Sequence, residues 1–287
     1  MRYTSAAAFR MALEDRIGRF NKGEFATLQR VRKGVAFERL VKRLQASPES
    51  PWFLKGAFAL DLRFGRRARV TKDLDLGMDL SLLGQVSLHR REVAGLLRTA
   101  TTISLDDFFT YDLLNEGEDL IQEPDVRAYR FLVRAGLAGR PFEDFRVDVG
   151  VGTQLVFPLD EIPESDTLAF AGIVPGTFRT ISLPQHFAEK IHAFTRRWEE
   201  RENTRVKDLV DIALILEVSP PEPSAVLTAL RGVFGGRGTH QLPAVIPDPP
   251  SSWAAQYAET AVEIGISCRE VGQAMELFRG YWPKVFP

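Results

Sequence analysis

Two aspartates spaced two residues apart are the side chains of this sequence best suited to chemistry. Asp73 and Asp75 stand in the run KDLDLGM, where the apolar Leu74 and Leu76 alternate with them. Alternate residues of a strand point to the same face, so both carboxylates would face one side while the leucines are buried opposite. Paired carboxylates repel each other unless a divalent cation is held between them. The spacing therefore predicts a metal site, and the alternative is an ordinary strand end that faces solvent.

A lysine–glycine turn upstream of this pair predicts a phosphate site. Lys55 and Gly56 lie in an apolar segment, residues 53–64, whose pattern predicts a short turn, a helix and a stop. Backbone N–H groups at a helix start can bind a triphosphate. A basic loop, Arg63 to Lys72, then leads into a strand predicted at residues 72–80. Metal and phosphate would therefore meet at one site.

A third carboxylate is needed if this site holds two magnesium ions. Asp148 is the best candidate, because it alternates with Val147 and Val149 on a strand predicted at residues 144–151. The alternative is that Asp148 is the single polar residue of a half-buried strand, which is common.

A helix after Pro184 supplies a candidate phosphate-binding lysine. Its apolar stripe recurs at helical spacing, and Lys190 and Arg197 share a flanking polar face. Asp208 and Asp211, three residues apart, follow a polar turn. They are candidates for the same site, and the alternative is an N-cap followed by an acid in the first helical turn.

The elements that must position these residues form a mixed pattern. We expect helices at residues 5–17, 24–46 and 87–100, and strands at residues 72–80, 126–135 and 144–151. Helices alternating with strands indicate an α/β or α+β layer, and the chain after Pro184 is mainly helical. We divide the chain at residue 180, with a core in residues 1–180 and a mainly helical domain in residues 181–287.

Composition excludes several classes of protein. The chain has 287 residues, of which 45% are hydrophobic and 26% are charged, so it is neither disordered nor a small disulfide-stapled fold. Cys268 is the single cysteine, which rules out an intrachain disulfide. The charged N-terminus does not resemble a signal peptide, and no run approaches the roughly 20 apolar residues that span a bilayer. We expect a cytoplasmic protein with no membrane contact.

The net charge of −1 conceals blocks of opposite sign. Basic residues gather at 30–43, 63–72 and 190–207, whereas residues 104–125 carry eight acids and no Lys or Arg. Clustered cations suit a polyphosphate or nucleic-acid surface, and solvated helix faces are the alternative.

Three ordered motifs resemble a known family. LKGAFALDLRFG, RVTKDLDL and QHFAEKIHAFTRRWEERENTRVKDLVDIALIL are similar to the signature of the nucleotidyltransferase superfamily, and specifically of the AbiEii/AbiGii toxin family, which includes the MenT-type toxins. The resemblance implies an α+β fold, with a polymerase-β-like core built on a mixed sheet and a helical C-terminal half. It also implies a toxin that uses Mg²⁺ or Mn²⁺ to transfer NMP from an NTP, often a pyrimidine, to the 3′ end of tRNA. A cognate antitoxin protein would be its partner.

The resemblance also assigns roles to residues. Asp73, Asp75, Lys190 and Asp211 would be catalytic, and Asp73, Asp75 and Asp148 would hold metal. We expect the nucleotide to be bound by Lys55, Gly56, Ala57, Arg69, Thr71 and Asp208. The pair Gly56-Ala57 departs from the Gly-Ser or Gly-Gly of the wider superfamily, so one hydroxyl contact to the triphosphate is missing.

Thr71 keeps a hydroxyl near the expected triphosphate, although a β-branched residue also suits a strand start. A phosphate on Thr71 would add negative charge beside the metal site and would repel the nucleotide.

Two rival functions remain open at this point. A metal-dependent glycosyltransferase would use Asp73 and Asp75 to hold a nucleotide-sugar diphosphate, but the upstream Lys-Gly turn and the later lysine motif argue against it. A non-catalytic relic that binds RNA or a partner protein is the second rival, and the joint presence of Asp73, Asp75, Asp148 and Lys190 argues against it.

Overall fold

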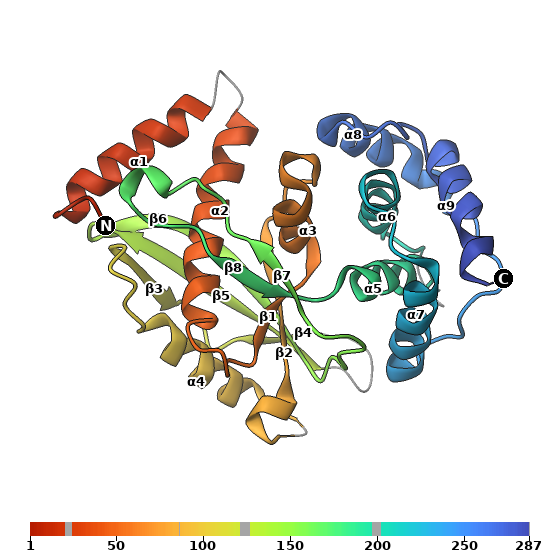
Figure 1. Ribbon diagram of the computed structural model, residues 1–287, viewed down its shortest axis with the longest axis horizontal. Helices are drawn as coiled ribbons and strands as arrows, with labels where there is room; N and C mark the ends of the chain where they lie inside the picture. Colours follow the sequence, from red (N-terminus) through yellow and green to blue (C-terminus); the bar gives the residue numbers. More distant parts are fainter. Residues whose placement is uncertain (21–24, 86, 121–126, 197–201, 287) are drawn as a thin grey trace.

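The computed structural model describes residues 1–20, 25–85, 87–120, 127–196 and 202–286. They form one mixed sheet flanked by helices, followed by a lobe made only of helices (Figure 1). The expected α+β class is confirmed. None of the helices in the described ranges has the length and apolarity that a bilayer crossing requires.

The helices and strands have the following bounds. The helices are α1 (Ala6–Phe20), α2 (Phe25–Leu44), α3 (Gly56–Phe64), α4 (Arg90–Thr101), α5 (Leu183–Thr195), α6 (Val206–Val218), α7 (Pro223–Arg237), α8 (Ala254–Ile264) and α9 (Val271–Val285). The strands are β1 (Trp52–Leu54), β2 (Asp73–Met78), β3 (Phe109–Leu113), β4 (Glu118–Leu120), β5 (Arg127–Leu137), β6 (Arg140–Val151), β7 (Asp160–Pro163) and β8 (Thr177–Thr180).

The strand order of the sheet is β3-β5-β6-β2-β1-β8-β7, with β4 paired to β5. Strands β2 and β6 run parallel, as do β1 and β8, and the other pairs are antiparallel. The mixed pattern brings β2 and β6, which are distant in sequence, next to each other at the middle of the sheet. The two strands expected to carry carboxylates are therefore neighbours.

Alternation along β2 and β6 separates a buried apolar face from a polar face. Leu74, Leu76, Val147 and Val149 are fully buried and belong to one core cluster with residues of α1, α2 and α4. These helices therefore cover the apolar face of the sheet, where burial of each aliphatic side chain contributes on the order of 2 kcal/mol. The carboxylates of the same strands lie on the opposite face.

A second core cluster occupies the helical lobe, on the right of Figure 1. Most of its members come from α5 to α9 and the segments between them, and Leu60 of α3 and Ala68 of the following loop join them. Helix α3 contacts both β2 and α6, so it packs against the sheet and the helical lobe at once. We keep the division at residue 180 as a proposal, with α3 as the element that joins the two parts.

Several short strands were not expected from the sequence. The segment at residues 53–64 begins with β1 before the helix, and β3, β4, β7 and β8 were not anticipated. Each of these strands has five residues or fewer, which is too short for an alternation pattern to be recognised. These segments form strands because they pair with neighbouring strands, and their own sequences do not indicate it.

Candidate active site

The carboxylates predicted from the sequence meet on the polar face of the sheet. Asp75 of β2 is in register with Asp148 of β6, and Asp73 is in register with Arg146. Neighbouring strands lie about 4.8 Å apart, so Asp75 and Asp148 are adjacent. The structure thus brings together the three acids that the sequence singled out.

The lysine–glycine turn lies directly against Asp75. The backbone N–H of Lys55 donates to the carbonyl of Asp75 at 3.1 Å. Gly56 opens α3 with a φ of +66°, and a Cβ at this position would lie 2.0 Å from Oδ2 of Asp75. Only glycine fits a left-handed backbone at such a close approach. The helix start expected to bind phosphate is therefore held beside the carboxylate pair.

The electrostatics of these acids favour a cation. Burial, reinforced by the neighbouring carboxylate of Asp148, raises the pKa of Asp75 to about 6. Lys190, Lys55 and Arg69 counteract part of this rise. Oδ1 of Asp73 is buried without a hydrogen-bond partner, and the nearest cation, Nη1 of Arg146, is 3.9 Å away. An orphaned carboxylate oxygen beside a second acid fits a divalent metal ion, whose preferred ligands are carboxylate oxygens.

Lys190 is the centre of a buried ion network between α5 and α6. Its ammonium lies 3.0 Å from Oδ1 of Asp208 and 2.8 Å from Oδ2 of Asp211. Arg69 forms a bidentate pair with Asp211 at 3.0 and 3.1 Å. Burial alone would lower the pKa of Lys190, but Asp211 and Asp208 raise it above its ordinary value. Lys190 therefore stays charged at any physiological pH.

The alternative assignment of Asp208 as an N-cap is wrong. Helix α6 begins at Val206 with Arg205 at the capping position, and Asp208 lies in the first turn. Lys190 itself is only 9% exposed, so it is not an ordinary solvated lysine. Arg197, expected on the same helix face, lies outside the described residues.

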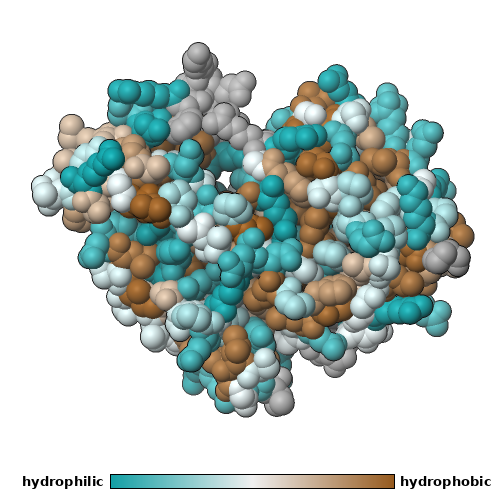
Figure 2. Space-filling view, in the orientation of Figure 1, coloured by the Kyte–Doolittle hydropathy of each residue, from teal (hydrophilic) through white to brown (hydrophobic). Residues whose placement is uncertain are grey.

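A cleft of about 560 Å³ opens between the sheet and the helical lobe beside these groups. Cationic side chains outnumber acidic ones along its wall. The lining residues are Lys55, Gly56, Arg69, Asp75, His186, Glu189, Lys190, His192, Ala193, Arg196, Thr204, Arg205, Lys207, Asp208, Arg237 and Gln256. Hydrophilic residues also gather along the boundary between the two parts of the molecule on the face seen in Figure 2.

Some of the residues expected to bind nucleotide do not reach this cleft. Ala57 is buried inside the first turn of α3. The hydroxyl of Thr71 donates to the carbonyl of Asp73 at 2.8 Å, so it is used by the backbone. Arg63 and Arg67 of the basic loop pair with Asp160 and Glu217, respectively, whereas Arg69 lines the cleft. Part of the basic loop is therefore structural.

The other two basic blocks also differ in role: some of their cations form internal ion pairs, and others line the cleft. In the first block, Arg39 and Arg43 of α2 both bind the buried carboxylate of Asp107, which comes from the acidic segment. In the third block, Arg196, Arg205 and Lys207 line the cleft. The prediction of a phosphate-binding surface applies best to this third block.

Three residues that contact the site were not anticipated from the sequence: Glu189, His186 and Arg130. Glu189 lies 3.5 Å from both Lys55 and Arg237, and so connects the Lys-Gly turn to α7. His186 is buried with both ring nitrogens unpartnered, and burial together with Lys190 lowers its pKa to about 3. Arg130 binds Asp148 from β5. Glu189 could have been considered from the sequence, because it is a charged residue directly before the candidate Lys190.

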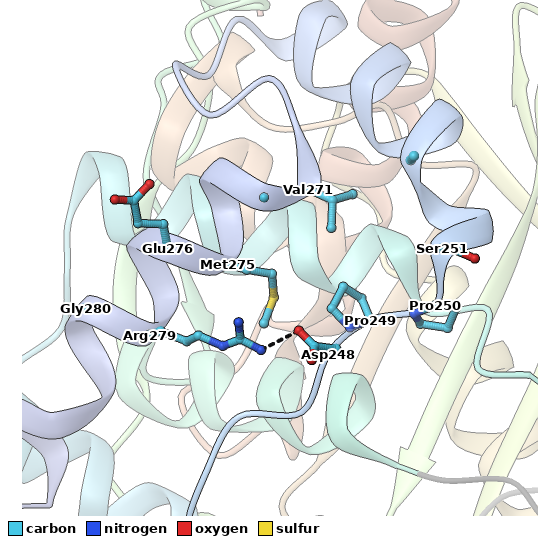
Figure 3. Close-up of a pocket in the computed structure, with 11 residues that line it drawn as sticks. Asp248, Pro249, Pro250, Ser251, Val271, Met275, Glu276, Arg279 and Gly280 are labelled. Atoms are coloured by element: carbon cyan, nitrogen blue, oxygen red, sulfur yellow. Dashed lines mark hydrogen bonds and ion pairs between the residues drawn. The ribbon is translucent and has the colours of Figure 1, made fainter.

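A second pocket, larger than the first cleft, lies in the helical lobe near the C-terminal end of the chain (Figure 3). Its volume is about 890 Å³, and it lies between residues 248–251 and α9. Val271, Met275 and prolines form an apolar wall, and the polar pair drawn there is Arg279 with Asp248 at 2.7 Å. This pocket lacks the converging carboxylates and cations that mark the first cleft as the active-site candidate.

Comparison with known families shows which family the chain belongs to. Residues 39–267, more than half of the chain, match the model of the nucleotidyl transferase AbiEii toxin family of type IV toxin–antitoxin systems. The chain belongs to the AbiEii family. The matched segment includes Gly56, Asp75, Lys190 and Asp208, which line one cleft, and Asp211, which pairs with Lys190 beside it.

One solved structure shares the fold of this AbiEii chain, and a second is similar to it more weakly. MenT4, a nucleotidyltransferase toxin from Mycobacterium tuberculosis H37Rv, aligns with a TM-score of 0.55 and 14% identity over 95% of this chain and 96% of its own. A protein from H. pylori described as a nucleotidyltransferase aligns with a TM-score of 0.40 and 17% identity over 90% of this chain and 98% of its own. The comparison with curated proteins gives no match.

Proposed function

We propose that this AbiEii protein is a metal-dependent nucleotidyltransferase toxin that adds NMP from an NTP to the 3′ end of tRNA and so blocks translation. The observation that carries the proposal is the convergence of Gly56, Asp75 and Lys190, from three separate motifs, at one cationic cleft, with Asp73 two residues before Asp75 on the same strand. Family membership supports the nucleotidyl transfer and the toxin role. The tRNA acceptor, the metal and a preference for pyrimidine nucleotides are parts of the proposal.

Asp73 and Asp75 would hold a magnesium or manganese ion, because their oxygens face one side and one of them is unpartnered. A divalent ion bound there lowers the pKa of an acceptor hydroxyl and offsets the charge of the triphosphate. The protein itself would bind the triphosphate and stabilise the charge on the leaving group. Backbone N–H groups at the start of α3 would bind the phosphates, and Gly56 would allow the chain to approach them closely.

Lys190 and Arg69 would stabilise the charge that develops on the leaving pyrophosphate. Asp208 and Asp211 hold Lys190 in place through charged hydrogen bonds, so little reorganisation is needed during the reaction. Arg196, Arg205 and Lys207 extend the cationic wall outward from this point. An RNA backbone is the polyanion that such a wall suits, and a tRNA acceptor end would bring its 3′-hydroxyl toward Asp75.

The antitoxin partner follows from the type IV toxin–antitoxin family. We propose that it restrains this activity, and modification of Thr71 remains a candidate route. The Thr71 hydroxyl is engaged with the Asp73 backbone, so a phosphate there would disturb the start of β2 as well as repel the nucleotide.

The test is a labelling assay with each α-labelled NTP, Mg²⁺ and total tRNA. We expect label at the tRNA 3′ end, and we expect Asp75→Asn to reduce it by at least about 100-fold, as for other groups that act electrostatically. Asp144→Asn is the matched control, because Asp144 also lies on β6 but is half exposed and pairs with Arg134. Label on protein instead of RNA, or full activity in Asp75→Asn, would contradict the proposal. No label with any NTP would favour a non-catalytic relic.

A further inference from the structure

The third carboxylate of the site, Asp148, already has a cation. Arg130 of β5 donates from Nε to Oδ1 at 2.8 Å and from Nη2 to Oδ2 at 2.6 Å. Both oxygens that a metal ion would use are therefore engaged by one guanidinium. Bidentate pairs of this kind are among the strongest hydrogen-bonded contacts in proteins.

The fold itself fixes this contact. Arg130 and Asp148 are directly opposite each other in the antiparallel register of β5 and β6. The two side chains are 28% and 17% exposed, so solvent screens them only in part. An arginine remains charged at every physiological pH, and the hydrogen bonds that Arg130 donates to Asp148, together with the charges of Asp148, Asp73 and Asp75, raise the pKa of Arg130 further. The cation is therefore permanent.

We propose that Arg130 takes the place of a second metal ion, so that the protein binds one divalent ion through Asp73 and Asp75 and Asp148 is not a metal ligand. This inference rests on the proposed metal site and replaces the expectation, made from the sequence, that Asp148 completes a two-metal site. Arg130 is a positioning residue, because it acts through Asp148.

Charge balance supports a single ion. Three carboxylates carry three negative charges, and the guanidinium of Arg130 leaves a net charge of −2, which one divalent ion neutralises. The nearby cations Lys190, Arg69 and Lys55 are paired with other acids: Asp208, Asp211 and Glu189. Arg146 is a weaker contributor, because its side chain is 54% exposed and its contact with Asp73 is 3.9 Å. A second ion on Asp148 would have to displace two charged hydrogen bonds.

The grouping of ligands agrees with this picture. Within the described ranges, no set of three or more His, Cys, Asp or Glu side chains is placed to hold a metal ion. Asp73 retains a buried oxygen without a hydrogen-bond partner, whereas both oxygens of Asp148 accept hydrogen bonds from Arg130. The two acids of β2 are thus prepared for a cation in a way that the acid of β6 is not.

Another ion pair on the same strands provides a matched control. Arg134 and Asp144 make the same bidentate contact, at 2.8 and 2.6 Å, between β5 and β6. Their side chains are 41% and 50% exposed, and Asp144 lies four positions before Asp148 on the same strand. Replacing Arg134 therefore removes an equivalent pair without touching the three carboxylates of the site.

The experiment counts bound Mn²⁺ in the free protein by electron paramagnetic resonance. We expect a single Mn²⁺ per chain in the wild type, in Asp148→Asn and in Arg134→Met, and none in Asp75→Asn. Arg130→Met frees the Asp148 carboxylate, so we expect it to bind a second Mn²⁺. Arg130→Lys retains the charge, and we expect it to bind one. Circular dichroism checks that each variant is folded, and Asp148→Asn decides the question even if Arg130→Met does not fold.

Two results would overturn the inference, and they differ in what they imply for the proposed function. Two Mn²⁺ ions in the wild type with one lost in Asp148→Asn would show that Asp148 is a ligand, and would leave the proposed transferase activity intact. No bound Mn²⁺ in the wild type would instead contradict the metal site on which both proposals depend.

Discussion

At the scale of single residues, the site depends on a contact that leaves no room for a side chain. Gly56 adopts a φ of +66°, and an added Cβ would lie 2.0 Å from Oδ2 of Asp75. The Asp75 side chain or the start of α3 must therefore shift in Gly56→Ala. A displacement of about 1 Å at reacting groups can cost about 100-fold in rate, and we expect a loss of this order in the labelling assay.

The control separates this collision from ordinary backbone strain. Gly84 also has a left-handed backbone, with a φ of +62°, but an added Cβ there meets nothing within 4 Å. Gly84→Ala should lose roughly 1 kcal/mol of stability from the strain and keep its activity. Equal loss of activity in the two variants would mean that the contact between Gly56 and Asp75 has no special role.

The sequence predicted the residues of this site better than their contacts. The spacing of Asp73 and Asp75 and the turn at Gly56 were sufficient to place three groups together, because alternation and helix starts are local rules. Arg130 was not foreseen, because its role arises from the register between β5 and β6. The hydroxyl of Thr71 was expected to face a triphosphate. In the structure it donates to the backbone carbonyl of Asp73, and nothing in the sequence indicates this hydrogen bond.

At the scale of elements, Asn203 holds the end of α5 against the beginning of α6. Its amide nitrogen donates to the carbonyls of Phe194 and Arg196 at 2.9 and 3.0 Å, and its amide oxygen accepts from the backbone N–H of Arg205 at 2.8 Å. These contacts satisfy carbonyls that a helix end leaves free. They also set the position of Lys190 on α5 relative to the acids of α6.

Asn203→Ala should therefore affect both stability and activity. Loss of these hydrogen bonds should cost about 1–3 kcal/mol of unfolding free energy, and the misplaced lysine should lower the transfer rate. Chemical denaturation and the labelling assay measure the two effects. Asn115→Ala is the comparison, since Asn115 makes one backbone hydrogen bond, to Leu132, away from the cleft. A stability loss in Asn203→Ala with an unchanged rate would show that α5 and α6 are aligned by other contacts.

Elements with long periodic patterns were predictable, and those defined by their neighbours were not. The helix after Pro184 and the strand around Val147 follow from their own apolar spacing. Strand β1 has three residues, all buried, and pairs with β2 and β8 from either side. No local pattern distinguishes such a segment from a turn that precedes a helix, because its pairing partners come from distant parts of the chain.

At the scale of the whole molecule, stability should depend on pH through a buried acid that does not line the active-site cleft. Glu38 of α2 is 8% exposed, and burial raises its pKa to about 7. The hydroxyl of Ser165 donates to this carboxyl at 2.9 Å, while Glu164 raises its pKa and Arg39 lowers it. The folded protein therefore holds a proton at Glu38 that the unfolded chain releases at a pH near 4.5.

The sign of the effect follows from proton linkage. Because the folded state binds the extra proton, the contribution of Glu38 to stability is complete below about pH 4.5, declines as the pH rises toward 7, and is lost above that. The pKa difference corresponds to on the order of 3 kcal/mol. Glu38→Gln removes this titration and keeps an acceptor for Ser165. We expect the variant to be more stable than the wild type at pH 8, and the difference to shrink toward zero at pH 4.5. Denaturant unfolding at the two pH values measures this, and a difference that does not change with pH would show that Glu38 is ionised in the folded protein throughout.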